Sequence, residues 1–170
     1  FEIYLNGGHL GGDLWDLVWE AGQRYNIMPG CPNLIERIEG GLMSYGNEFT
    51  SINNPIECGF GPLCYLGDEI DYIGKKSLMK IAEDGPKQKL CGVKFGGEAT
   101  SACTKPYKLI SQDGHLIGNI TSGIYSPRLK CNVGVGMIAI KHAKIGQKIS
   151  VVVDEGQFRE GVVSKTPFEI

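Results

Sequence analysis

The stretch LIGNITSGIYSPRLKCNVGVGMIAI, residues 116–140, decides the fold of the second half of the chain. Leu116–Ile124 and Asn132–Ile140 each have the length and apolar content of a β-strand, and Ser126-Pro127 between them is a turn signal. Gly134-Val135-Gly136 lies inside the second strand, where glycines mark a bulge or close backbone packing. The stretch therefore predicts two consecutive strands of a β-rich domain.

Four more segments on either side of this stretch have the same character, and turn signals such as Asp113-Gly114 separate them. These segments are Leu90–Phe95, Tyr107–Ser111, Lys148–Val153 and Phe158–Ser164. Short strands at this spacing are typical of a small barrel or sandwich, and we predict a six-stranded antiparallel β-barrel. The change of character after Pro86 predicts a domain boundary between residues 1–86 and 87–170.

The first of these domains is expected to be α+β. Alternation along Phe1–Leu5 predicts a strand, and Leu42–Gly67 is a long loop of the kind that often carries function. Helices are predicted at Gly11–Arg24, Pro32–Glu39 and Lys75–Glu83. Trp15 and Trp19, at helical spacing in the first helix, are expected in the core.

The single predicted strand of this domain lies at the start of the sequence, where it needs partners for its backbone groups. One strand is also too few for three helices, so we expect residues before Phe1 to complete the sheet. A chain lacking that part would expose apolar faces. Pairing with the absent segment is therefore expected, and a homodimer is the alternative.

Composition excludes several classes of function. The chain has 170 residues, is 42% hydrophobic and carries a net charge of −2, without a Lys/Arg block for nucleic acid or an apolar run that could span a membrane. Its six cysteines form no Cys-x-x-Cys pair, and Cys58 and Cys64 have no nearby His, so no metal site is predicted. Reduced cysteines without a signal peptide predict a cytoplasmic protein.

Motif chemistry by itself identifies no active site. Gly59-Phe60-Gly61 lacks the Lys-Ser/Thr of a phosphate loop, and the three histidines are far apart, each beside a turn. Cys58 is expected to be a small buried residue. On these grounds alone the chain is only a globular protein of two parts.

The ordered set of short motifs is more informative, and it resembles the glycine-cleavage T-protein family over essentially the whole chain. The matching residues are Phe1-Glu2-Ile3-Tyr4, Arg37-Ile38-Glu39-Gly40-Gly41-Leu42, Tyr45-Gly46, Asn54-Pro55-Ile56-Glu57-Cys58-Gly59-Phe60-Gly61, Tyr72-Ile73-Gly74-Lys75 and Thr121-Ser122-Gly123-Ile124-Tyr125-Ser126-Pro127-Arg128-Leu129. Each motif is weak alone, but their common order is specific.

The resemblance implies a folate-binding α+β domain, followed by the β-barrel, and tetrahydrofolate as cofactor. It also implies a transferase of one-carbon groups, with folate and a small methyl or aminomethyl donor as partners. Family members are longer, and the catalytic Asp near folate N5 and N10 lies in an N-terminal half that this sequence lacks. The catalytic residues are therefore unknown here, and the chain alone is expected to be inactive.

One departure bears on the subfamily. The T-protein has Ala-Arg-Asp before the Arg-x-Glu motif, with an Arg that helps hold folate, whereas this chain has Pro32-Asn33-Leu34. Asn cannot replace the bidentate charged contact of Arg. Asn54–Gly61 and Ser126–Asn132 look more like the dimethylsulfoniopropionate demethylases, which pass a methyl group from a sulfonium to tetrahydrofolate. The alternatives are an aminomethyltransferase and a non-catalytic folate-binding relative.

Five residues are expected to bind the cofactor if the resemblance holds: Glu2, Tyr4, Tyr45, Glu57 and Arg128. Glu2 could accept hydrogen bonds from the N–H groups of the pterin ring, and Tyr4 on the same strand face could stack or line the sulfonium site. The loop position of Tyr45 and Glu57 suits binding residues. Arg128 could attract the glutamate tail of folate. Arg37 and Glu39 are expected to pair with neighbours.

Overall fold

The computed structural model describes residues 3–30, 33–153 and 156–169. Contacts divide the chain into two compact units, residues 1–31 and residues 32–170, and each is described by itself. The division into domains at residue 86 stays a prediction.

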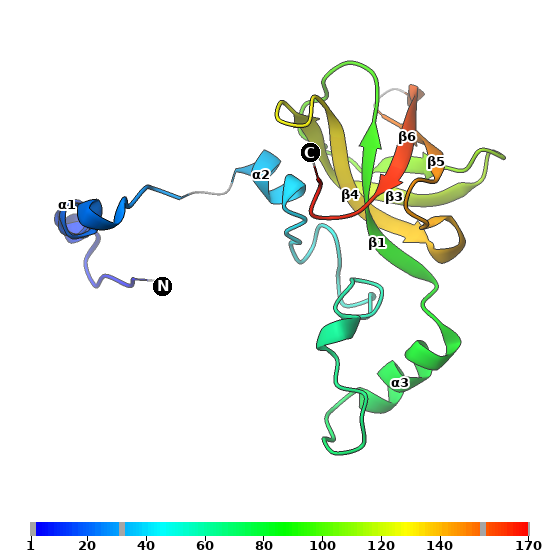
Figure 1. The fold of residues 1–170 in the computed structure, drawn as a ribbon, viewed down its shortest axis with the longest axis horizontal. Coiled ribbons are helices and arrows are strands. Elements are labelled where there is room, and N and C mark those ends of the chain that lie inside the picture. Colours follow the sequence, from blue (N-terminus) through cyan, green and yellow to red (C-terminus); the bar gives the residue numbers. More distant parts are fainter. Residues whose placement is uncertain (1–2, 31–32, 154–155, 170) are drawn as a thin grey trace. The chain divides into compact units, whose positions relative to one another are not determined.

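Six strands of the second unit form a closed barrel in the order β1-β4-β3-β2-β5-β6. Figure 1 shows the barrel with most of its strands labelled. They are β1 (Gln88–Phe95), β2 (Tyr107–Ile110), β3 (Leu116–Ser126), β4 (Cys131–Ala139), β5 (Lys148–Val152) and β6 (Phe158–Ser164). All neighbouring strands are antiparallel. The predicted six-stranded antiparallel barrel is confirmed, with strand ends within a few residues of those expected.

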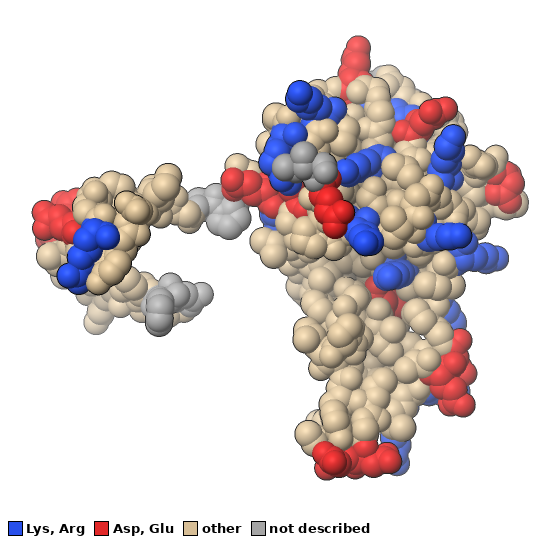
Figure 2. Space-filling view, viewed as in Figure 1, with Lys and Arg blue, Asp and Glu red and all other residues tan. Residues whose placement is uncertain are grey.

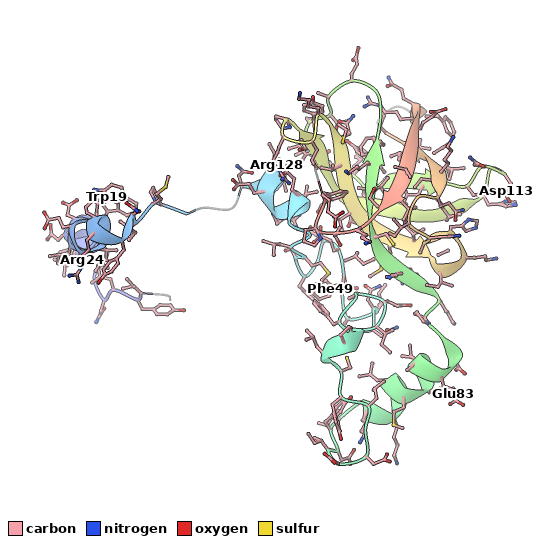
Figure 3. The ribbon with its side chains drawn as sticks, viewed as in Figure 1. Trp19, Arg24, Phe49, Glu83, Asp113 and Arg128 are labelled. Atoms are coloured by element: carbon pink, nitrogen blue, oxygen red, sulfur yellow. The ribbon has the colours of Figure 1, made fainter. Side chains whose placement is uncertain are left out.

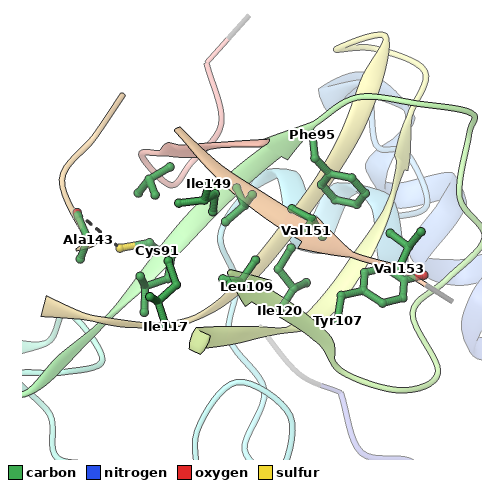
Figure 4. Packing of buried hydrophobic residues seen from close by; sticks show 13 residues of the cluster. Cys91, Phe95, Tyr107, Leu109, Ile117, Ile120, Ala143, Ile149, Val151 and Val153 are labelled. Atoms are coloured by element: carbon green, nitrogen blue, oxygen red, sulfur yellow. Dashed lines mark hydrogen bonds between the residues drawn. The ribbon is translucent and has the colours of Figure 1, made fainter. Parts of the chain in front are cut away.

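Side chains from every strand fill the interior of the barrel (Figure 4), and Val93, Leu109, Ile120 and Val151 are fully buried. Gly136 of β4 is needed for the contact between β3 and β4, because a Cβ there would lie 1.9 Å from the Asn119 carbonyl oxygen. The glycines of this strand thus mark a close backbone approach.

A second apolar cluster lies on the outer wall of the barrel, where Ile38 of α2 (Leu34–Glu39) packs with Val133, Val135 and Phe168. A capping box starts α2: the Asn33 side chain accepts from the Glu36 amide, and the Glu36 carboxylate accepts from the Asn33 amide. The helix predicted at Pro32–Glu39 is confirmed from Leu34 on, with Asn33 as its cap, and Pro32 lies outside the described part of the chain.

Between α2 and β1 the chain runs away from the barrel and returns through α3 (Lys75–Asp84), which matches the third predicted helix. A short 3₁₀ turn, η3 (Gly61–Leu63), interrupts this segment. Large apolar side chains along it are exposed, with Ile52 at 89%, Leu63 at 83% and Ile73 at 104%. We call the segment between α2 and β1 the limb. On the face seen in Figure 2, much of the limb, drawn below the barrel, carries no charged side chain.

The first unit contains η1 (Gly8–Leu10), α1 (Gly11–Gly22) and η2 (Gln23–Tyr25). The prediction of a strand at Phe1–Leu5 is wrong for its described part, because Ile3–Leu5 has no regular structure. A strand forms beside another strand, and none is assigned among the described residues of the first unit.

The prediction that Trp15 and Trp19 are core residues is also wrong. Trp15 is 57% exposed and Trp19 is 40% exposed, and their rings stack on each other with centroids 6.4 Å apart. The two rings line an apolar pocket with Val18 and Ile27. One helix and one following segment are too little material to enclose two indoles.

None of the described helices is long and apolar enough to cross a bilayer.

Candidate functional site

The C-terminal end of α2 is joined to the barrel through the buried carboxylate of Glu39. This carboxylate accepts a short hydrogen bond from the Ser126 hydroxyl and one of 2.6 Å from the Arg128 Nε. Burial raises the pKa of Glu39, but the bonds from Ser126 and Arg128 outweigh it and hold the pKa below the ordinary value. Glu39 is therefore ionised at neutral pH.

A second carboxylate, Glu48, lies in the loop after α2, and its side chain is only 1% exposed. It accepts hydrogen bonds from the Ser44 amide at 2.6 Å and from Arg37 at 3.1 and 3.3 Å. Burial raises the pKa of Glu48, but hydrogen bonds from Ser122, Arg37 and Ser44 lower it below the ordinary value. Arg37 also donates to the Ser122 hydroxyl at 2.7 Å.

Two of the motifs noted in the sequence thus bind each other. Arg37 and Glu39 of the α2 motif contact Ser122, Ser126 and Arg128 of the β3 motif, with Ile38 buried between them. The expectation that Arg37 and Glu39 pair with neighbours is confirmed.

Arg128 lies beside α2 in Figure 3, with its Nε on Glu39, and its side chain is 48% exposed. Its charge is partly neutralised by this buried partner, which leaves less of it for an anionic ligand. A role of Arg128 in cofactor binding stays a prediction.

Tyr45 is presented on a tight turn in the loop after α2. The Gly46 amide donates to the Phe49 carbonyl at 2.8 Å, and Gly46 has a φ of 91° that favours glycine. The Tyr45 side chain is 68% exposed, and its ring meets Phe49 edge-on, with centroids 5.7 Å apart. Phe49 in turn meets Phe60 edge-on at 6.3 Å (Figure 3 labels Phe49). The Tyr45 ring is thus supported on one side and open to a ligand.

Glu57 is buried, with 6% of its surface exposed, and it hydrogen-bonds to other residues of the second unit. Its carboxylate accepts from Gln88 at 3.3 Å and from the Asn54 amide at 3.5 Å, while its backbone carbonyl accepts from the Leu90 amide at 2.8 Å. These contacts attach the loop to the start of β1. Direct contact of Glu57 with a cofactor stays a prediction.

The remaining predicted residues belong to the first unit. Glu2 lies outside the described residues, and Tyr4 is 87% exposed. In the second unit, Tyr45, Glu57 and Arg128 contact Phe49, Gln88 and Glu39 respectively, so the structure gives these three residues separate partners.

A groove of about 440 Å³ lies between the loop after α2 and the barrel wall, lined by Met43, Cys58 and Phe60 from the loop and by Lys89 and Lys165 from the barrel. Burial raises the pKa of the Cys58 thiol, with a smaller contribution from Glu57, so the thiol stays protonated at neutral pH. Cys58 is a small buried residue, as expected. Among the described residues no group of three or more His, Cys, Asp and Glu side chains could hold a metal ion.

Sequence reasoning did not note Glu48, and it noted Ser122 only as part of the Thr121–Leu129 motif. A Glu in a polar loop is normally solvated, and a Ser in a strand is a common residue, so neither type signals a contact. What distinguishes Glu48 and Ser122 is their contact with Arg37. That contact becomes evident once the structure shows β3 against α2.

Known proteins contain a similar barrel. The family model for the glycine cleavage T-protein C-terminal barrel domain matches residues 88–168, which span all six strands. The chain carries the C-terminal barrel portion of the glycine cleavage T-protein family. Dimethylsulfoniopropionate demethylase DmdA of Ruegeria pomeroyi is 40% identical to this chain. The matched region covers 92% of this chain and 42% of the demethylase. The aminomethyltransferase of Alkaliphilus metalliredigens is 34% identical over 98% of the chain and 44% of its own length.

A solved glycine cleavage system aminomethyltransferase T from Bartonella henselae has the same fold, with a TM-score of 0.69 and 22% identity. That match covers 78% of this T-protein family chain and 37% of the solved chain. The chain thus spans less than half the length of the curated relatives described above.

Proposed function

We propose that this chain is the C-terminal part of a tetrahydrofolate-dependent methyltransferase that demethylates dimethylsulfoniopropionate and forms 5-methyltetrahydrofolate. The observation that carries the proposal is the 40% identity to the Ruegeria pomeroyi demethylase over 92% of the chain. Asn33 supports it, because this side chain caps α2 through a 3.0 Å bond from the Glu36 amide where the T-protein motif has a folate-holding Arg.

The chemistry needs little acid–base help. The lone pair of folate N5 attacks the methyl carbon, the C–S bond breaks with its electrons remaining on sulfur, and the N5 proton leaves to solvent. The sulfonium of dimethylsulfoniopropionate thereby becomes a neutral thioether sulfur, and the product keeps its carboxylate charge. The protein must align N5, carbon and sulfur and keep water out. An aromatic face beside the sulfonium would stabilise its charge by about 0.5–2 kcal/mol.

The decisive experiment uses the polypeptide encoded by the open reading frame that contains these 170 residues. With tetrahydrofolate and dimethylsulfoniopropionate, we expect 5-methyltetrahydrofolate and methylmercaptopropionate in equal amounts. The aminomethyltransferase relative, at 34% identity, favours a second candidate, aminomethyl transfer. Methylenetetrahydrofolate formed only from an aminomethyl-lipoyl donor would support this second candidate. Folate binding without either product would support a non-catalytic relative.

Tyr45 is proposed to contact the folate. Replacement of Tyr45 by alanine is expected to weaken tetrahydrofolate binding by about 1 kcal/mol, because an open aromatic ring would lose its stacking contact. Isothermal titration calorimetry of the full polypeptide with tetrahydrofolate measures the change in binding free energy. Tyr25→Ala is the matched control, since Tyr25 is 71% exposed and Tyr45 is 68% exposed. Equal affinities for the two variants would remove Tyr45 from the site.

The apolar limb between α2 and β1 is proposed to pack against an N-terminal half like the one that the relatives have. Leu63 at 83% and Ile73 at 104% exposure are the anchors of this surface. Leu63→Asp and Ile73→Asp are expected to weaken association with a separately expressed N-terminal half at least tenfold, because each would bury a charge. Glu83→Lys on α3 is the control for a change of charge alone.

Self-association is the competing outcome of that experiment. Sedimentation of the 170-residue chain as a dimer, lost in both Asp variants, would favour a homodimer over pairing with an N-terminal half. A cytoplasmic location stays a prediction.

A further inference from the structure

The backbone on both sides of Tyr45 is held, although its side chain is exposed. On one side the Ser44 amide donates to the Glu48 carboxylate at 2.6 Å, and on the other the Gly46 amide donates to the Phe49 carbonyl at 2.8 Å. The Asn47 and Glu48 amides both donate back to the Ser44 carbonyl. The direction in which the Tyr45 ring leaves this turn is therefore set by the position of Glu48.

Glu48 is itself attached to the barrel. The Arg37 guanidinium connects it to β3, because Arg37 donates to the Glu48 carboxylate at 3.1 Å and to the Ser122 hydroxyl at 2.7 Å. Ser122 follows an irregularity in the pairing of β3 with β4, between Ile120 and Ser122, and is buried at 6% exposure. Because β3 belongs to a closed barrel, Ser122 is a rigid reference point.

We propose that Ser122 is a positioning residue, which acts through Glu48 to hold Tyr45 in its ligand-facing position. The inference rests on the proposed function, in which Tyr45 contacts folate. The barrel then contributes to the folate site indirectly, because the Ser122 hydroxyl holds the Arg37 guanidinium, which in turn holds the Glu48 carboxylate on which the Tyr45 turn is built. Arg37 completes this connection, since it also donates to the Leu42 carbonyl at 2.8 Å at the start of the loop.

The test compares Ser122→Ala, Ser122→Thr and Ser164→Ala in the full polypeptide. Ser122→Ala is expected to raise KM for tetrahydrofolate three- to tenfold, with kcat and KM for the sulfonium within twofold. Ser122→Thr keeps the hydroxyl and is expected to restore the KM. The Ser164 hydroxyl of β6 donates to the Val162 carbonyl of its own strand at 3.4 Å, so Ser164→Ala should leave all constants unchanged. A KM for folate that stays unchanged in Ser122→Ala, or a Thr variant as impaired as the Ala variant, overturns the proposal.

A second readout does not depend on activity. In the 170-residue chain labelled with 3-fluorotyrosine, the ¹⁹F signal of Tyr45 is assigned as the one lost in Tyr45→Phe. Ser122→Ala is expected to shift or broaden that signal and to leave the other tyrosine signals in place. An unmoved Tyr45 signal rejects the positioning role. Absence of methyl transfer with a shifted signal would reject the proposed function and keep the link between Ser122 and Tyr45.

Discussion

Alanine at position 136 is expected to prevent the barrel from closing. A Cβ on Gly136 would lie 1.9 Å from the Asn119 carbonyl oxygen and 2.7 Å from the Ile120 Cα. Both atoms are backbone, so no side-chain rotation can relieve the overlap, and β3 and β4 would have to separate. We expect Gly136→Ala to destabilise the fold by about 3 kcal/mol or more. Urea unfolding followed by circular dichroism measures the change.

Gly96→Ala is the matched control at the end of β1. A Cβ there would meet only the Glu160 carbonyl oxygen at 3.9 Å, an ordinary contact, so its unfolding free energy should stay within about 0.5 kcal/mol of the wild type. If Gly136→Ala unfolded at the same urea concentration as Gly96→Ala, the close contact between β3 and β4 would be refuted.

Removal of the Glu48 carboxylate is expected to have the second largest effect. Glu48→Ala leaves the Arg37 guanidinium and the Ser44 amide without their partner in a half-buried site. Breaking such a pair from one side costs about 3 kcal/mol, because a charge is left uncompensated. Chemical unfolding of Glu48→Ala, Arg37→Ala and the double variant gives the coupling energy. A double variant as unstable as the sum of the single variants would exclude a direct interaction.

The same site predicts how stability depends on pH. Glu48 and Glu39 have folded pKa values below the ordinary value of 4.5, so their ionised forms stabilise the folded state above that pH. This contribution is lost as the pH falls through the folded pKa values. We therefore expect the unfolding free energy to decrease below pH 4.5, and Glu48→Gln to show a smaller decrease. Glu83→Gln, which changes an exposed carboxylate, should follow the wild type.

Sequence alone was sufficient for the six strands of the barrel and for the three α-helices of the described residues. The six strands were predictable because each is a short apolar run between turn signals, and these are local properties. The motif order also indicated the family that the comparisons found. Fully local features such as the Asn33 start of α2 lay within two residues of the expected positions.

The contacts among these elements could not be predicted from the sequence. Trp15 and Trp19 have the spacing of core residues, yet burial depends on how much other chain is available to cover them, and in the first unit that is little. The strand predicted at Phe1–Leu5 is absent from its described part, Ile3–Leu5, since a strand forms beside another strand and none is assigned among the described residues of the first unit.

The sequence by itself determined the six barrel strands and the α-helices, because spacing, turn residues and caps act over a few residues. Only the tertiary structure decided that Arg37 and Glu39 meet Ser122, Ser126 and Arg128, because the packing of α2 against the outer wall of the barrel brings together residues more than 80 positions apart. The energy of these contacts comes from burial and from paired charges, and neither is defined until the chain has folded.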